Sequence, residues 1–183
     1  KELQIELPQM TLSNVDWEIN TSAENEVVRE GLEEYGARRY VILEKGGVRI
    51  AVIGLFGEDA SACAPLSGLC FDHIVESARG LVRRLKAKEH PDLIVALSHS
   101  GTASRPEKSE DEILAREVPD IDVIISGHTH TTLPEPLMGR GNYIVSCGCY
   151  GECLGRLVLR RGEDGWQAEA YELIPMDGSI RGD

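Results

Sequence analysis

The chain lacks the features that mark membrane-spanning and nucleic-acid-binding proteins. None of its apolar runs is long enough to cross a bilayer. Its 19 lysines and arginines form no long basic run and are outnumbered by 31 acidic residues, so the formal net charge is -12. A field of this sign disfavours binding to nucleic acids and to anionic membranes. We therefore expect neither kind of partner.

Cysteines are few, and no secretory signal opens the chain. The five cysteines are odd in number and irregularly spaced, which argues against a disulfide framework. Cys147, Cys149 and Cys153 lie close together without forming a Cys-x-x-Cys pair, so we interpret them as buried structural thiols, with metal or redox use as alternatives. A cytoplasmic location is favoured over export. The first residue is Lys1 and not Met, so we expect a mature, trimmed or cut chain.

Two apolar runs each end in a serine followed closely by histidine. Residues 122–131 read Asp-Val-Ile-Ile-Ser-Gly-His-Thr-His-Thr, and residues 92–101 read Asp-Leu-Ile-Val-Ala-Leu-Ser-His-Ser-Gly. Such runs are typical of parallel strands that are buried on both faces. Open α/β sheets bind ligands at the carboxyl ends of their strands. We therefore expect two neighbouring strands that face one site.

Three histidines follow these strands and are the candidate metal ligands: His99, His128 and His130. Residues two apart in an extended loop point the same way, so the imidazoles of His128 and His130 are expected to converge on one point or on two adjacent points. Neutral imidazole is a common ligand for zinc, manganese, iron and nickel. A lone histidine is more often only a hydrogen-bonded polar residue, and we keep that interpretation for His73 and His90.

The hydrophobic pattern predicts a single α/β domain over residues 1–183. A helix over 71–89 carries an apolar stripe, and a helix over 110–117 follows a capping box made by Ser109 and Glu112. These helices alternate with strands at 92–98 and 122–126, which indicates a right-handed parallel unit. Upstream we expect a strand over 10–17, a helix over 24–35 with Val27, Val28 and Leu32 facing inward, a Gly46-Gly47 hairpin joining strands 39–45 and 48–55, and a loop over 57–68.

The last quarter of the chain changes character. Short strands are predicted at 143–146, 154–161 and 167–174, separated by glycine-rich turns. They favour an antiparallel meander whose tightest turn spans 162–165. The polar residues 179–183 resemble the start of a linker.

Taken in order, these segments resemble the calcineurin-like metallophosphoesterases, in the branch of the 5′-nucleotidases and 2′,3′-cyclic-nucleotide phosphodiesterases. The resemblance is carried by the segments 96–101, 125–131 and 148–157, and the upstream segments 12–15 and 47–55 fit in the same order. It covers nearly the whole chain.

The resemblance implies a partial four-layer α/β/β/α sandwich with mixed sheets and outer helices. It implies two divalent metal ions (Mn, Zn, Fe or similar) about 3.5–4 Å apart at the sheet edge. By resemblance, His99 and His128 are ligands of the second metal, and His130 is a ligand of the first.

Several of the family's earlier motifs do not occur ahead of the matched segments in this chain. The Asp-x-His, Gly-Asp and Gly-Asn-His-Glu motifs supply the other ligands and a catalytic histidine, and the nucleotidase branch adds a C-terminal nucleoside-binding domain. The chain thus resembles the latter two thirds of the catalytic domain, and we assign no catalytic or substrate-binding residue in it. Three neutral histidines offer no anionic ligand, so zero or one metal is expected for this chain alone. Of the possible substitutes, Asp72, Asp120 and Asp122, the last two precede a strand and are expected at the far edge of the sheet.

The predicted function is that of a metal-dependent phosphoester hydrolase of the 5′-nucleotidase type. The resemblance implies that a metal-activated hydroxide attacks the phosphorus of a nucleotide or similar small phosphate ester. The chain alone is expected to be inactive or weakly active. The alternative is a non-catalytic module with an empty or single-metal site, which needs a partner chain or forms a dimer through an unpaired sheet edge.

Overall fold

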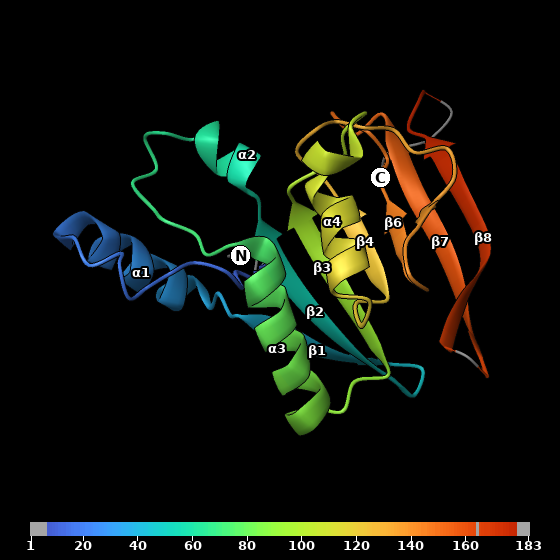
Figure 1. The fold of residues 1–183 in the computed structure, drawn as a ribbon, viewed down its shortest axis with the longest axis horizontal. Coiled ribbons are helices and arrows are strands. Elements are labelled where there is room, and N and C mark those ends of the chain that lie inside the picture. Colours follow the sequence, from blue (N-terminus) through green and yellow to red (C-terminus); the bar gives the residue numbers. More distant parts are fainter. Residues whose placement is uncertain (1–6, 164, 179–183) are drawn as a thin grey trace, which may run out of the picture.

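A mixed sheet of six strands forms the centre of the chain (Figure 1). The computed structural model describes residues 7–163 and 165–178. The sheet order is β1-β2-β3-β4-β6-β5, and β7 pairs with β8 in a separate two-stranded ribbon. Along the chain the elements are α1 (Ala23–Tyr35), β1 (Tyr40–Lys45), β2 (Val48–Phe56), α2 (Glu58–Ala62), α3 (Ile74–Lys88), β3 (Leu93–His99), the 3-10 turn η1 (Pro106–Lys108), α4 (Glu110–Glu117), β4 (Val123–Ser126), β5 (Leu137–Met138), β6 (Tyr143–Val145), β7 (Cys153–Gly162) and β8 (Gly165–Pro175).

The central strands are parallel and end at one edge of the sheet. Strands β2, β3, β4 and β6 run parallel to one another, while β1 and β5 pair antiparallel at the two sides. The register sets Phe56 opposite His99 and Ser98 opposite Ser126. The α/β class, the mixed sheet, the Gly46-Gly47 hairpin and the two neighbouring Ser-His strands are therefore confirmed.

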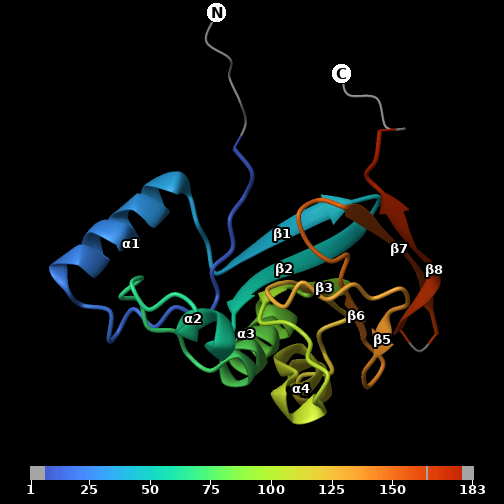
Figure 2. The ribbon, with the colours of Figure 1, turned by 90° about the horizontal axis from the view of Figure 1, so that it is seen from above.

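Helices α3 and α4 cover one face of this sheet (Figure 2). The predicted stripe of α3 is buried through Ile74, Val75, Ala78, Leu81, Val82 and Leu85. Leu114 of α4, Ile53 of β2 and Ile124 of β4 join the same core at 0% exposure. The capping box is wrong, because Ser109 Oγ accepts a hydrogen bond from the Ala103 amide and does not cap α4.

The β7–β8 ribbon covers only part of the opposite face. The indole Nε1 of Trp166 donates to the Asp92 carbonyl (2.6 Å), and the Ala168 amide donates to the Tyr143 hydroxyl (2.9 Å). The ribbon therefore packs against β6 and the start of β3. Leu97 and Ile125 remain 44% and 45% exposed near the strand ends. Burial on both faces was thus a wrong expectation there, because no described element covers these two side chains.

The N-terminal region departs from two expectations. Residues 10–17 form isolated bridges, Thr11 with Arg38 and Val15 with Phe71, in place of a strand. Asn14 holds this segment in place, since its side chain donates to the carbonyls of Phe56 and Asp72. The predicted helix is present as α1 and ends at Gly36, but it extends away from the sheet (Figure 1) and has no buried residue. Val27 is 67% exposed, so the inward packing was wrong.

The C-terminal strands divide between two sheets. Strand β6 lies parallel to β4 in the central sheet, so the predicted meander is wrong for residues 143–146. The other two strands form the expected hairpin, in which Gly162 pairs with Gly165. Asp164 of its turn and the predicted linker 179–183 lie outside the described residues.

The cysteines and the segment after β2 also differ from expectation. All five cysteines are free, and Cys147 is exposed while Cys149 and Cys153 are partly buried, so the expectation of buried thiols was wrong. The expected loop 57–68 contains the short helix α2. No helix in the described part of the chain combines the length and the apolar character needed to cross a bilayer.

Candidate functional site

Two of the candidate histidines meet where β3 and β4 end. The Gly127 amide donates to the Ser98 carbonyl (2.8 Å), which brings the loop after β4 alongside the end of β3. The ring centroids of His99 and His128 are 5.0 Å apart, with an interplanar angle of 56°. His99 also stacks on Phe56 at the end of β2, with centroids 5.6 Å apart and planes 7° apart. Three adjacent strand ends therefore contribute aromatic rings to one place.

The loop after β4 is folded tightly and is not extended. His128 and His130 both have positive φ, 71° and 55°, a conformation that residues with a side chain adopt rarely and often at functional sites. The expected extended loop is therefore wrong, and the alternation of side chains in an extended chain does not apply to His128 and His130. The ring of His130 packs edge-on against Tyr150, with centroids 5.2 Å apart. The structure thus joins His99 with His128 and places His130 against the loop that follows β6.

The charge state of His99 suits a metal ligand. Partial burial lowers the pKa of His99, and the neighbouring His128 and His130 lower it further because a second positive charge is unfavourable there. The imidazole of His99 is consequently neutral at neutral pH, the form in which histidine binds metal ions.

A buried carboxylate supports the histidine loops from beneath. Asp111 of α4 is 0% exposed and accepts hydrogen bonds from the Ser98 hydroxyl (2.6 Å) and the Gly101 amide (3.0 Å). Burial raises the pKa of Asp111 to about 6, although the hydroxyls of Ser126 and Ser98 oppose the rise. The Ser126 hydroxyl is buried without a hydrogen bond of good geometry, so it acts on Asp111 only through a weaker dipole contact.

Asp59 was missed in the sequence and lies in direct contact with His128. Its Oδ2 is 2.9 Å from His128 Nε2. Asp59 follows β2, whose carboxyl end lies beside that of β3, so extending the rule of strand ends to a third strand indicates it. Among the described residues, the one group of three histidine, cysteine or acidic side chains whose ligand atoms lie within 4.8 Å of one another is Asp59, Cys63 and His128.

Two of the three substitutes suggested by the sequence lie at the far edge of the sheet. Asp122 accepts a hydrogen bond from the Ile94 amide, and Asp120 pairs with Lys86, both at the opposite edge from His128. Asp72 lies near the end of β2, because the Asn14 side chain donates to the carbonyls of both Phe56 and Asp72. His73 precedes α3 and lies 3.7 Å from Glu58 Oε1 at the cleft described below, whereas His90 follows α3.

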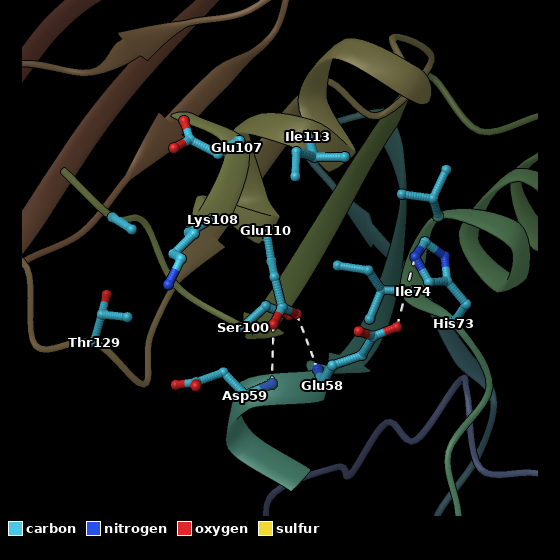
Figure 3. Close-up of a pocket in the computed structure, with 12 residues that line it drawn as sticks. Glu58, Asp59, His73, Ile74, Ser100, Glu107, Lys108, Glu110, Ile113 and Thr129 are labelled. Atoms are coloured by element: carbon cyan, nitrogen blue, oxygen red, sulfur yellow. Dashed lines mark hydrogen bonds and ion pairs between the residues drawn. The ribbon is translucent and has the colours of Figure 1, made fainter. Parts of the chain in front are cut away.

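An acidic cleft of about 580 Å³ adjoins the site (Figure 3). It does not include His99 or His130, and it meets the histidine loops through Asp59 and Thr129. Glu110 closes one side by accepting hydrogen bonds from the amides of Glu58 and Asp59 (3.0 Å each). The lining also includes Glu107 and Lys108. A phosphorylated ligand would need a bound cation to offset these carboxylates.

Comparisons with known proteins agree with this arrangement. The family described as Calcineurin-like phosphoesterase matches residues 12–132. The trifunctional nucleotide phosphoesterase protein YfkN of Bacillus subtilis (strain 168) is 31% identical over 137 residues, covering 73% of this chain and 9% of that protein. A 5′-nucleotidase of Vibrio cholerae serotype O1 is 31% identical over 166 residues, covering 75% of this chain and 30% of the relative.

A solved structure shares the fold. The 5′-nucleotidase precursor from Thermus thermophilus superposes with a TM-score of 0.69 at 27% identity, covering 92% of this chain and 34% of that one. The chain thus spans less than a third of the length of these two relatives and about a third of this structure. With a family match over most of its length and the Ser-His strand ends in place, the chain belongs to the calcineurin-like phosphoesterases, in the branch that contains the 5′-nucleotidases.

Proposed function

We propose that this chain forms part of a metal-dependent phosphoester hydrolase that acts on nucleotides or similar small phosphate esters. The observation that carries the proposal is the contact between His99 and His128 at the adjoining ends of β3 and β4, in a chain of this family. The relatives named 5′-nucleotidase and nucleotide phosphoesterase support the substrate class.

The residues present suit divalent metal ions. His99 is neutral, His128 is mostly buried with 15% of its side chain exposed, and both lie at the open edge of the sheet. Bound metal ions would polarise a phosphoryl oxygen and offset the acidic field. His99 and His128 would hold such an ion, and Asp111 would fix the loop that carries His99. His130 is proposed as a further ligand, which requires its ring to turn from Tyr150 toward the other two.

The cleft beside the histidines offers a place for the substrate. Thr129 and Lys108 line it together with Asp59, whose carboxylate contacts His128, so the Lys108 cation is available to a phosphate bound in the cleft. We propose that this cleft receives the organic part of the ester, while the phosphate faces the metal ligands.

The test is phosphate release from nucleoside 5′-monophosphates by the longest natural form of the protein, with manganese or zinc. The variant His128→Ala should lose activity by at least about 100-fold, because a direct ligand matters no less than its supporting groups. The matched control is His90→Asn, which keeps a residue tolerant of the positive φ of 49° and lies away from the site. Full activity in His128→Ala would remove the proposal.

A second candidate is a non-catalytic module with an empty or single-metal site. The uncovered side chains of Leu97 and Ile125 and the edge strand β1 favour it, because both invite a partner chain or a second copy. Metal analysis of the longest natural form of the protein separates the two candidates: two metal ions per chain support the hydrolase, whereas zero or one supports the module.

A further inference from the structure

The helix α2 places two side chains toward the histidine loop. Asp59 and Cys63 are four residues apart, one at the start of α2 and one at its C-cap, so they lie on the same side of a helical turn. The cleft view shows Asp59 extending from α2 toward the side on which Thr129 lies (Figure 3). This geometry directs both side chains at His128 of the neighbouring loop.

The position of α2 is fixed by hydrogen bonds to Glu110 and by the close approach of Gly57 to Ser100. Glu110 accepts hydrogen bonds from the amides of Glu58 and Asp59, which fixes the first turn of α2 against the start of α4. Gly57 permits this approach, because a Cβ there would lie 2.8 Å from the Ser100 Cα and 2.3 Å from Glu110 Oε2. Gly57 and the Glu110 carboxylate therefore keep α2 beside the ends of β3 and β4.

We propose that Asp59, Cys63 and His128 form a zinc site with one position left open. Carboxylate, thiolate and imidazole are the three kinds of ligand that zinc uses in proteins. Their ligand atoms already lie within 4.8 Å of one another, and a tetrahedral zinc ion needs separations of about 3.3–3.8 Å. Small side-chain rotations close that difference, since Asp59 is 72% exposed in its side chain and Cys63 is exposed.

Asp59 and Cys63 supply the negative charge that the three histidines lack. Three neutral imidazoles bring no negative charge, whereas Asp59 and a Cys63 thiolate together balance a dication. The thiolate also selects the metal, because sulfur ligands prefer zinc and cobalt to magnesium or manganese. The site shares His128 with the proposed hydrolase and so rests in part on that proposal, but metal binding can be measured without any hydrolysis.

The experiment is a cobalt titration of the whole protein, followed by absorbance. In the wild-type protein, cobalt bound at Cys63 should give a thiolate-to-metal charge-transfer band. The absorbance of this band should reach a plateau when the site is full, and added zinc should displace the cobalt and remove the band. Cys63→Ser should lose the band, and Asp59→Asn should weaken binding by at least about 10-fold. Cys70→Ser is the matched control, since Cys70 is an exposed thiol in the same connection between β2 and α3, and it should keep the band.

Two results would overturn the site: a band that persists in Cys63→Ser, or no band in the wild-type protein. Circular dichroism of each variant checks that the fold is kept. The two proposals fail in different ways. A charge-transfer band without phosphate release removes the hydrolase and keeps the site, whereas equal phosphate release by wild type and Cys63→Ser, with no band in either, removes the site and keeps the hydrolase.

Discussion

The two faces of the six-stranded sheet carry similar residues and are covered very differently. Ile124 and Ile125 are neighbours on β4, yet Ile124 is 0% exposed under the helices and Ile125 is 45% exposed on the other face. On β3, Ala96 is 0% exposed and Leu97 is 44% exposed. A face that remains open in spite of apolar side chains is a surface available to other protein or to ligand.

The same alternation separates support from chemistry at the strand ends. Side chains two apart share a face, so Ser98 points to the helix side, where it donates to Asp111, and His99 follows Leu97 to the open side. One strand thus ends in a buried hydrogen bond on one face and in a candidate ligand on the other. The difference teaches that the covered face holds the loops in place, while the open face exposes the imidazole.

The sharpest test of the comparison is a pair of adjacent truncations on β4. Ile124→Ala should lower the free energy of unfolding by about 2–5 kcal/mol, because it leaves a cavity in a closed core. Ile125→Ala should cost about 1 kcal/mol, because its side chain is already half exposed. Urea denaturation followed by circular dichroism measures both. Equal losses in the two variants would mean that the open face is covered in solution.

Asp111 provides a test of the covered face through pH. Its pKa rises from 3.8 to about 6 on folding, so the folded chain binds the proton more tightly than the unfolded chain. This group therefore favours folding below about pH 4, and its contribution is lost as the pH rises through about 6. The loss amounts to about 3 kcal/mol.

The variant Asp111→Asn removes this titration. It should be less stable than the wild type at low pH because it loses an acceptor for Ser98 or Gly101. The difference in unfolding free energy between the wild type and the variant should narrow by up to about 3 kcal/mol between about pH 3.5 and pH 7, because only the wild type loses the contribution of Asp111. The measurement is the free energy of unfolding of both proteins across that range. A gap that stays constant would show that Asp111 does not titrate in the folded chain within it.

Local pattern predicted the parallel unit of the fold well. The stripe of α3, the Gly46-Gly47 turn and the two Ser-His strand ends are set by residues close together in the sequence, and each of them is present. Coverage of a face depends on segments far apart in the sequence, so the exposure of Leu97 and the departure of β6 from the meander could not be read from periodicity.

The site was predictable in part for the same reason. His99 and His128 follow strands of obvious pattern, and their contact follows from the register of β3 and β4. Asp59 stands in a segment without a clear pattern, and only the fold shows that α2 returns to His128. His130 faces Tyr150 in a loop whose histidines have positive φ values. Residues other than glycine adopt such values too rarely for the sequence to predict them.

The smallest predicted effect concerns the boundary between covered and open parts of the second face. Trp166→Phe keeps an aromatic ring in β8 and removes the hydrogen bond from Nε1 to the Asp92 carbonyl, at a cost of about 1 kcal/mol. Because Arg161 of β7 also pairs with Asp92, the ribbon should loosen without leaving the sheet. Amide hydrogen exchange should therefore quicken by about 5-fold in β7 and β8 if they open separately from the core. The amides of α3 in the same sample serve as the control: if they quicken equally, the ribbon and the helix-covered core unfold as one unit, and the two faces share a single stability.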